Sequence, residues 1–414
     1  MRNILKKKFF PSWLWVVLCS IAIFLTVPIA RRIQIFVSNN WGREVFGYFV
    51  LVVLFIGAIS LLYYLIFKLK IRILSNYIWL FIVTGLYIYF TSKLWKAPEE
   101  AVHFLEYGLL GFFLFKALTH HIRDKSIYVT ATFFTLFVGT IDEILQWMIP
   151  LRYWDFRDVG LNCLSGGLFQ LIVWKVVQPK IISEKMNFKS LRIFSYIFIS
   201  CLIILGLCVS NTPQRVTVYT KKIPWLSFLQ KEESMSEFGY KYGNQEIGTF
   251  YSRLSPKSLQ KIDNLRGKQY SQILNASIDK DYKQFLRDYT PITDPFMHEL
   301  RIHIFRRDTY FKKGKSASNL NEKKKFHLIA YKENLILEKY FSHSIEKSVY
   351  HWNEDALQEL EVSIDKSKAY ESPVSANLFT SFSEKRIRIF ILFILIVMGL
   401  VNFIYYANEK KRRC

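Results

Sequence analysis

Long apolar runs recur along the chain, separated by short polar stretches. Eight of these runs are 18 to 23 residues long, close to the roughly 20 residues that a helix needs to cross a bilayer. They predict eight membrane-spanning helices: Trp13–Ala30, Phe46–Phe67, Tyr77–Trp95, Ala101–Leu118, Ile127–Ile149, Val159–Val177, Ile193–Ser210 and Ile387–Ala407. The first run is long for a signal peptide and lacks a small-residue cleavage site, so we interpret it as a retained helix.

The segment 211–385 has no long apolar run and no cysteine, so it predicts a separate domain held by a packed core. Ser255-Pro256 resembles a helix start, and the apolar spacing after it is helical. Further helices are predicted over Asp279–Tyr289, Asp294–Tyr310 and Lys325–Tyr340. The alternation at 300–304 also fits a strand, and the basic stretch Lys312–Lys325 is typical of a loop.

The predicted fold class is therefore an all-α polytopic membrane protein with about eight transmembrane helices and a helix-rich extracytoplasmic domain inserted before the last helix. Five parts follow from this division. They are an N-terminal two-helix membrane segment (1–76), a four-helix membrane core (77–178), a cytoplasmic loop with the seventh helix (179–210), the extracytoplasmic domain (211–385), and a closing helix with a basic cytoplasmic tail (386–414).

The formal net charge of +23 would suggest a nucleic-acid partner in a soluble chain. Here the positive charge is instead concentrated in the loops on one side of the predicted spans. With the N-terminus inside, the short cytoplasmic segments hold 17 Lys and Arg, and the short outer loops hold 6. This asymmetry predicts a multi-pass protein of the cytoplasmic membrane with both termini in the cytoplasm and 211–385 outside it. No nucleic-acid partner is expected.

Only eleven acidic residues lie outside 211–385. Seven of the eleven lie in three short stretches, 98–108, 139–146 and 152–158, each at the outer end of a predicted span. A carboxylate inside a membrane costs a few kcal/mol unless it faces a polar cavity, is paired or serves a function. The pattern predicts a polar pocket that opens outward between neighbouring helices.

This pocket supplies the candidate functional residues. The candidates for catalysis are His103, Glu100, Asp142 and Glu143, because a histidine flanked by carboxylates suits general acid–base chemistry. The candidates for substrate binding are Tyr107, Gln146, Arg152, Asp155, Asp158 and Asn162. Structural alternatives stay open: an ion pair of Arg152 with Asp155 or Asp158, and an interhelix hydrogen bond at Asp142-Glu143. No metal site is assigned and the cofactor is unknown, although His103 and the carboxylates leave a divalent cation open.

Three motifs of these stretches resemble the VanZ-like family of membrane proteins. They read Glu100-x-x-His103-x-x-x-Tyr107-x-x-x-Gly111, then Asp142-Glu143-x-x-Gln146, then Pro150-x-Arg152-x-x-Asp155-x-x-Asp158-x-x-x-Asn162-x-x-x-Gly166. The resemblance covers about residues 77–178. Many family members carry an Asp-Lys pair where this chain has Glu99-Glu100. The founding member is associated with resistance to the glycopeptide teicoplanin, so the resemblance implies lipids, lipid-linked cell-wall precursors or a glycopeptide as partners.

Three functions follow as hypotheses, and the sequence does not decide whether the protein is an enzyme. In the first, an envelope protein binds or modifies a lipid or cell-wall headgroup in the pocket. In the second, a non-catalytic scaffold or resistance factor acts through the segment 211–385. The third is an ion-coupled transporter, which the clustering of charge at one leaflet disfavours.

Overall fold

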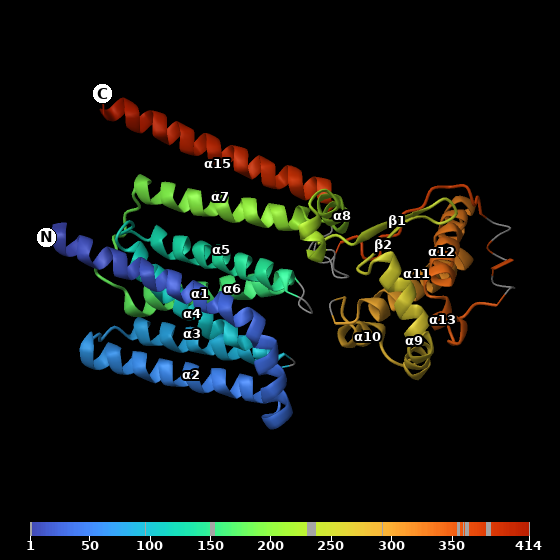
Figure 1. The fold of residues 1–414 in the computed structure, drawn as a ribbon, viewed down its shortest axis with the longest axis horizontal. Helices are drawn as coiled ribbons and strands as arrows, with labels where there is room; N and C mark the ends of the chain where they lie inside the picture. Colours follow the sequence, from blue (N-terminus) through green and yellow to red (C-terminus); the bar gives the residue numbers. More distant parts are fainter. Residues whose placement is uncertain are drawn as a thin grey trace. The chain divides into compact units, whose positions relative to one another are not determined.

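The computed structural model describes residues 2–413 except 96, 150–153, 230–236, 292, 354–356, 359, 361–363 and 378–381. The chain divides into two compact units, which are considered separately. A membrane unit comprises Met1–Leu207 and Arg388–Cys414, and a second unit comprises Cys208–Ile387. Figure 1 gives the order of the elements along the chain.

The membrane unit is built from long apolar helices. They are α1 (Arg2–Trp41), α2 (Glu44–Tyr63), α3 (Leu74–Lys93), α4 (His103–Leu118), α5 (Ser126–Met148), α6 (Phe156–Leu171), α7 (Phe188–Ser210) and α15 (Glu384–Arg413), whose first residues belong to the second unit. Three shorter turns extend this set: π turns η1 (Tyr64–Lys68) and η3 (Ile172–Val177), and the 3₁₀ turn η2 (Pro98–Val102). Eight helical segments are long and apolar enough to cross a membrane. The prediction of an eight-helix polytopic protein is confirmed.

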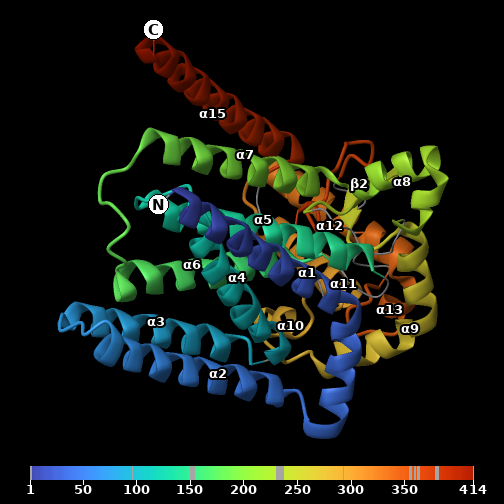
Figure 2. The same cartoon turned by 60° about the vertical axis from the view of Figure 1, so that its left-hand side comes forward.

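Helices α4, α5 and α6 form the centre of the membrane unit. Helix α6 packs along both α4 and α5, α1 packs on α4, and α2 lies beside α3, as Figure 2 also shows. The contact between α5 and α6 is close because Gly166 meets Thr135: a Cβ at Gly166 would lie 2.6 Å from the Thr135 side chain. Small residues of this kind let helix backbones approach in a membrane. Helices α5 and α6 are therefore held at a close spacing at this point.

The second unit is helix-rich and also contains one β-hairpin. Its elements are α8 (Pro213–Lys222), η4 (Pro224–Leu229), β1 (Tyr240–Asn244), β2 (Gly248–Ser252), α9 (Pro256–Ala276), α10 (Tyr282–Asp288), α11 (Pro295–Ser316), α12 (Leu320–Tyr340) and α13 (Ser342–Glu346). The strands pair antiparallel with Tyr242 opposite Phe250. The sequence did not predict this hairpin, because each strand is only five residues long and contains a glycine, which weakens the strand signal.

Side-chain caps set where these helices begin. Ser255, Asp281 and Asp294 each accept a backbone N–H of the first turn of α9, α10 and α11, as N-cap residues do. The predicted helix after Ser255 is confirmed. The alternation at 300–304 resolves as helix, because the residues buried around it follow helical spacing.

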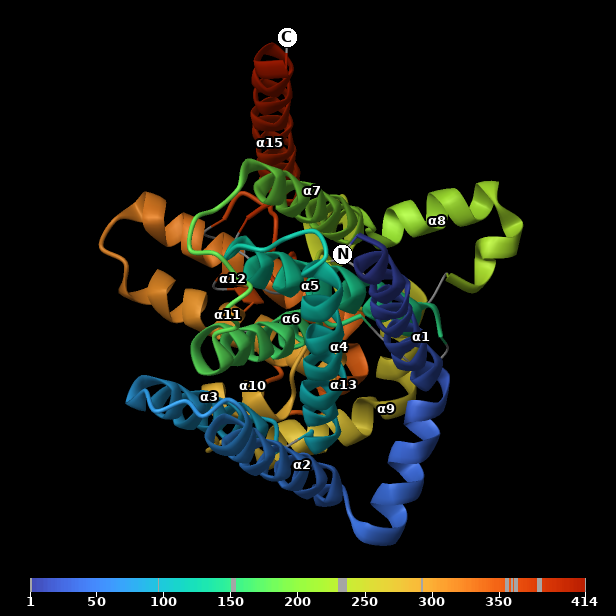
Figure 3. The ribbon, with the colours of Figure 1, turned by 90° about the vertical axis from the view of Figure 1, so that its left-hand side faces the viewer.

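The predicted loop over Lys312–Lys325 is wrong. Helix α11 continues to Ser316, and α12 begins at Leu320 after the cap residue Asn319. Figure 3 shows the resulting helical hairpin. Basic residues have good helix propensity, and Gly314 is tolerated because the His327 ring fills the space that a side chain would take. Composition gave the wrong prediction here, because an exposed, charged helical face has the same kinds of residues as a loop.

A large hydrophobic core and a smaller cluster around Ala330 and Tyr331 hold the second unit together. The large core joins the hairpin to α9, α11 and α12, and its fully buried members include Phe250, Leu259, Phe296, Ile304 and Leu337. The four cysteines that the structure describes, Cys19, Cys163, Cys201 and Cys208, are free thiols. Apolar burial, rather than cross-linking, therefore stabilises this unit.

Candidate functional site

The three acidic stretches meet in the membrane unit through three polar contacts. The Tyr107 hydroxyl donates to Asp142 Oδ2 at 3.0 Å and ties α4 to α5. The backbone N–H of Asp155 lies 3.5 Å from Glu143 Oε2 and ties the start of α6 to α5. Arg157 Nη2 donates to Glu100 Oε1 at 2.6 Å and ties α6 to η2. We call the residues of these contacts, together with the polar residues beside them, the polar cluster. Its members are Glu100, His103, Glu106, Tyr107, Asp142, Glu143, Gln146, Asp155, Arg157, Asp158 and Asn162.

The acidic pair of α5 is almost completely buried. Asp142, Glu143 and Gln146 are 2%, 1% and 3% exposed. The Gln146 amide donates to Asp142 Oδ2 at 3.1 Å and to Glu143 Oε1 at 2.9 Å. This spacing places all three on one helix face within a single turn. An amide that donates to both carboxyl groups holds the pair in place.

Arg157 is the cation that the sequence did not single out. Besides Glu100, it lies near Asp155 (Nε to Oδ2, 3.5 Å) and Asp158 (Nε to Oδ1, 3.9 Å). Its side chain is 55% exposed, so these pairs are partly solvated. Arg152, the predicted partner, lies outside the described residues. Both arginines belong to the same short stretch, and spacing alone could not choose between them.

His103 begins α4 and has an acidic partner one turn on. Its Nδ1 is 3.5 Å from Glu106 Oε2, and both side chains are mostly buried. The carboxylate beside this ring is therefore Glu106 of the same helix. Glu99, which precedes Glu100 in the sequence, makes different contacts. It accepts a hydrogen bond from Gln34 at 2.5 Å and forms an ion pair with Arg43. Glu99 therefore belongs to a contact with α1 and the start of α2.

Asn162 lies against α5 at the base of the polar cluster. A Cβ on Gly139 would sit 2.7 Å from the Asn162 side chain, so this glycine makes room for the amide. Asn162 is 0% exposed, and within the described part of the chain neither its nitrogen nor its oxygen has a hydrogen-bond partner. A buried amide in this condition costs about 1–3 kcal/mol unless something else binds it. Asn162 is thus a donor and acceptor available to a ligand or water.

Charge is unbalanced in the polar cluster. The described residues bring six carboxyl groups, Glu100, Glu106, Asp142, Glu143, Asp155 and Asp158, together with one arginine and one histidine. At the edge of α6, burial and the neighbouring Asp158 raise the pKa of Asp155 to about 6. Among the described residues, no three histidine, cysteine or carboxylate side chains converge so that they could hold a metal ion. The cluster therefore offers acceptors, one acid–base residue and an exposed guanidinium.

Comparison with protein-family models, with curated proteins and with solved structures finds no match for this chain. What the polar cluster can bind is therefore inferred from the chemistry of its own residues.

Proposed function

We propose that this chain is a VanZ-like integral membrane protein of the cell envelope. In this proposal the polar cluster faces away from the cytoplasm and binds or modifies the headgroup of a lipid or of a lipid-linked cell-wall precursor. A role in resistance to glycopeptides of the teicoplanin type would follow from a change in such a headgroup. The motif spacing over 77–178 and the asymmetry of Lys and Arg support the family and the orientation.

The observation that carries the proposal is the convergence of three helix ends on buried acceptors. The excess of carboxyl groups over arginine favours a headgroup rich in hydroxyl or amino donors, because each carboxylate can accept several hydrogen bonds. Asn162 supplies a buried amide whose hydrogen bonds a ligand can complete. Arg157, half exposed at the rim, suits a phosphate oxygen.

His103 is the residue through which the site would act on a bound headgroup. With Glu106 beside one ring nitrogen, the ring can take or give a proton at a hydroxyl group. Asp142 and Glu143 would position donors of the headgroup. A protein that only binds the headgroup would need the acceptors but not His103, so this residue separates modification from binding.

The test combines substitution with lipid and wall-precursor profiling. Strains carrying His103→Ala, Glu143→Gln or Asp158→Asn are compared with a deletion strain, with membrane levels of each variant measured. The matched control is Glu44→Gln, an exposed carboxylate at the start of α2 in the same unit. We expect the three variants to reproduce the profile of the deletion strain and the control to match wild type.

Two results would count against the proposal. If all three variants keep the wild-type profile while removal of 211–385 abolishes it, the protein acts through its second unit as a scaffold or resistance factor. If purified protein in liposomes instead carries an ion flux that depends on Glu143, the transporter hypothesis replaces it.

A further inference from the structure

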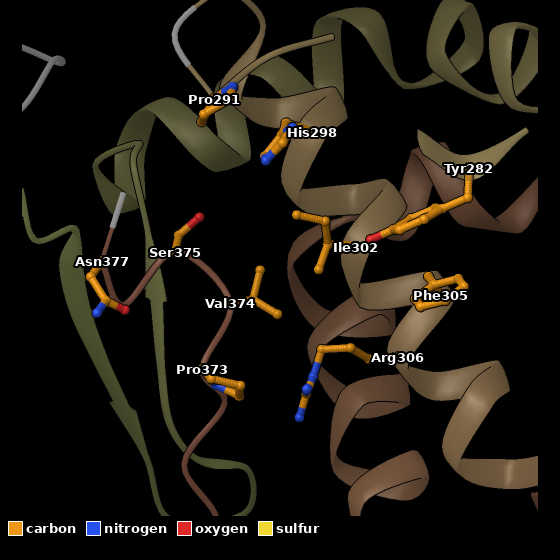
Figure 4. A pocket seen from close by; sticks show the side chains of 10 residues that line it. All are labelled: Tyr282, Pro291, His298, Ile302, Phe305, Arg306, Pro373, Val374, Ser375 and Asn377. Atoms are coloured by element: carbon orange, nitrogen blue, oxygen red, sulfur yellow. The ribbon is translucent and has the colours of Figure 1, made fainter. Parts of the chain in front are cut away.

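The second unit contains a cavity of about 370 Å³, which is independent of the polar cluster. One wall is a face of α11 formed by His298, Ile302, Phe305 and Arg306, and the other is the segment 373–377 (Figure 4). Tyr282 and Pro291 close the side near α10. The volume falls in the range of small-ligand sites.

A histidine acceptor lies at one end of this cavity. His298 Nδ1 is 2.8 Å from the carbonyl oxygen of Tyr289. A carbonyl can only accept, so Nδ1 carries the proton and Nε2 is left with its lone pair. Burial lowers the pKa of His298, which keeps the ring neutral. The ring is directed into the cavity (Figure 4), so Nε2 can accept from a ligand N–H or O–H.

Arg306 lies at the other end of the cavity, and a buried carboxylate fixes its side chain. Arg306 Nε donates to Glu333 Oε1 at 2.9 Å. Glu333 is fully buried and also accepts from His303 at 2.5 Å and from Ser372 at 2.9 Å. Because its charge is shared with these donors, Glu333 fixes the guanidinium without using all of its N–H groups. Arg306 Nη2 also lies 3.5 Å from the Tyr370 hydroxyl, and the remaining N–H groups of the guanidinium are left for a second carboxylate.

Ser375 in the opposite wall is held by a second buried carboxylate. Its hydroxyl donates to Glu299 Oε1 at 2.7 Å, and Glu299 is 0% exposed. The backbone of Ser375 has a φ of 53°, a conformation that is uncommon outside glycine and is found at functional sites. Two polar groups of the cavity are thus fixed in advance by buried carboxylates, a form of pre-organisation that favours binding.

The spacing of these groups selects the ligand. His298 and Arg306 are eight residues apart on α11, about 12 Å along the axis, which is the length of roughly three to four extended residues. Between them the wall is apolar where Ile302 lies opposite Val374 (Figure 4). A sugar is less suited to this wall, because the Tyr282 ring is already stacked on Phe305 at 3.9 Å.

We propose that this cavity binds a short peptide with a free C-terminal carboxylate. The carboxylate pairs with Arg306, an apolar side chain lies against Ile302 and Val374, and an N–H at the far end donates to His298. This inference does not rest on the function proposed for the polar cluster.

Calorimetric titration of the purified full-length chain in detergent micelles tests the site. The probes are the tripeptide Ala-Leu-Ala as the free acid, the same peptide as its C-terminal amide, and N-acetylglucosamine. We expect saturable binding of the acid and binding of the amide at least about tenfold weaker, since a hydrogen bond to a charged group contributes that much. No saturable binding of the acid, equal binding of acid and amide, or binding of the sugar alone would overturn the proposal.

Variants assign the two ends of the cavity. Arg306→Lys should weaken binding of the acid about tenfold, and His298→Asn should weaken it severalfold, because the Asn amide keeps the bond to Tyr289 but lacks Nε2. The matched controls are Arg287→Lys and His351→Asn, exposed residues of the same unit, which should bind as wild type. If Arg306→Lys fails to fold, His298→Asn decides, and wild-type affinity in that variant refutes the site.

Discussion

Glu333 provides the sharpest test of how the second unit is held together. It is fully buried and accepts hydrogen bonds from His303, Arg306 and Ser372. Burial acts to raise the pKa of Glu333, but the interactions with His303, Arg306 and Tyr370 hold it at about 2, against a reference value of 4.5, with the charge of His303 the largest of these favourable causes. Such a shift corresponds to about 3 kcal/mol of folding free energy.

The pH dependence follows from the sign of this shift. A carboxyl group whose pKa is lower in the folded state stabilises the fold at pH values above its unfolded pKa, and this contribution is lost as pH falls through the folded pKa. The contribution of Glu333 is thus complete above about pH 5, and roughly 2 kcal/mol of it is gone at about pH 3.

Glu333→Gln removes the charge and leaves Arg306 and His303 without their carboxylate. We expect the unfolding free energy of the second unit to fall by about 3 kcal/mol at neutral pH, which is roughly a 100-fold loss of protection. Hydrogen exchange of the full-length chain, read by mass spectrometry on peptides from α11 and α12, measures this locally. The acid-dependent loss of stability should also become smaller in the variant.

The control is Glu322→Gln, an exposed residue in the first turn of the same helix. Its loss should stay below about 1 kcal/mol, the usual contribution of a charge at a helix end. Protection in Glu333→Gln within about 1 kcal/mol of wild type, or an unchanged response to acid, would refute the reasoning.

Three further predictions concern the membrane unit and the topology. Gly166→Ala should destabilise the membrane unit by about 1–3 kcal/mol in thermal unfolding, because the added Cβ would meet Thr135. Gly160→Ala is the control, since its added Cβ would enter open space and should leave stability unchanged. Equal melting temperatures of the two variants would contradict this. Asp124→Ala should cost about 1–3 kcal/mol, because Ser126 hydrogen-bonds that carboxylate and lowers its pKa. The loss should shrink as pH falls through that lowered pKa, and a loss unchanged in acid would contradict the assignment. With the native cysteines replaced, Leu265→Cys should react with a membrane-impermeant maleimide on intact cells, because Leu265 is 73% exposed in the proposed outer unit. Labelling only after permeabilisation would reverse the orientation.

The sequence by itself determined the class of the protein. Hydrophobic run length is a local property, and a run of about 20 apolar residues has few structures other than a membrane helix. The helix starts at Ser255 and Asp294 could also be predicted from the sequence, because an N-cap is a local signal that acts within its own turn. Local signals failed where a helix is charged, as over Lys312–Lys325, and where strands are short and contain glycine, as in the hairpin at Tyr240–Ser252.

Only the tertiary structure decided which polar groups meet. The sequence indicated three acidic stretches, but pairing between helices depends on their rotation and spacing, which close contacts such as Gly139 with Asn162 set. Arg157 therefore emerged as the cation beside Glu100, and Glu106 as the partner of His103. The cavity at His298 and Arg306 was equally hidden, because its second wall lies about 70 residues further along the chain and long-range packing leaves no periodic signal in sequence.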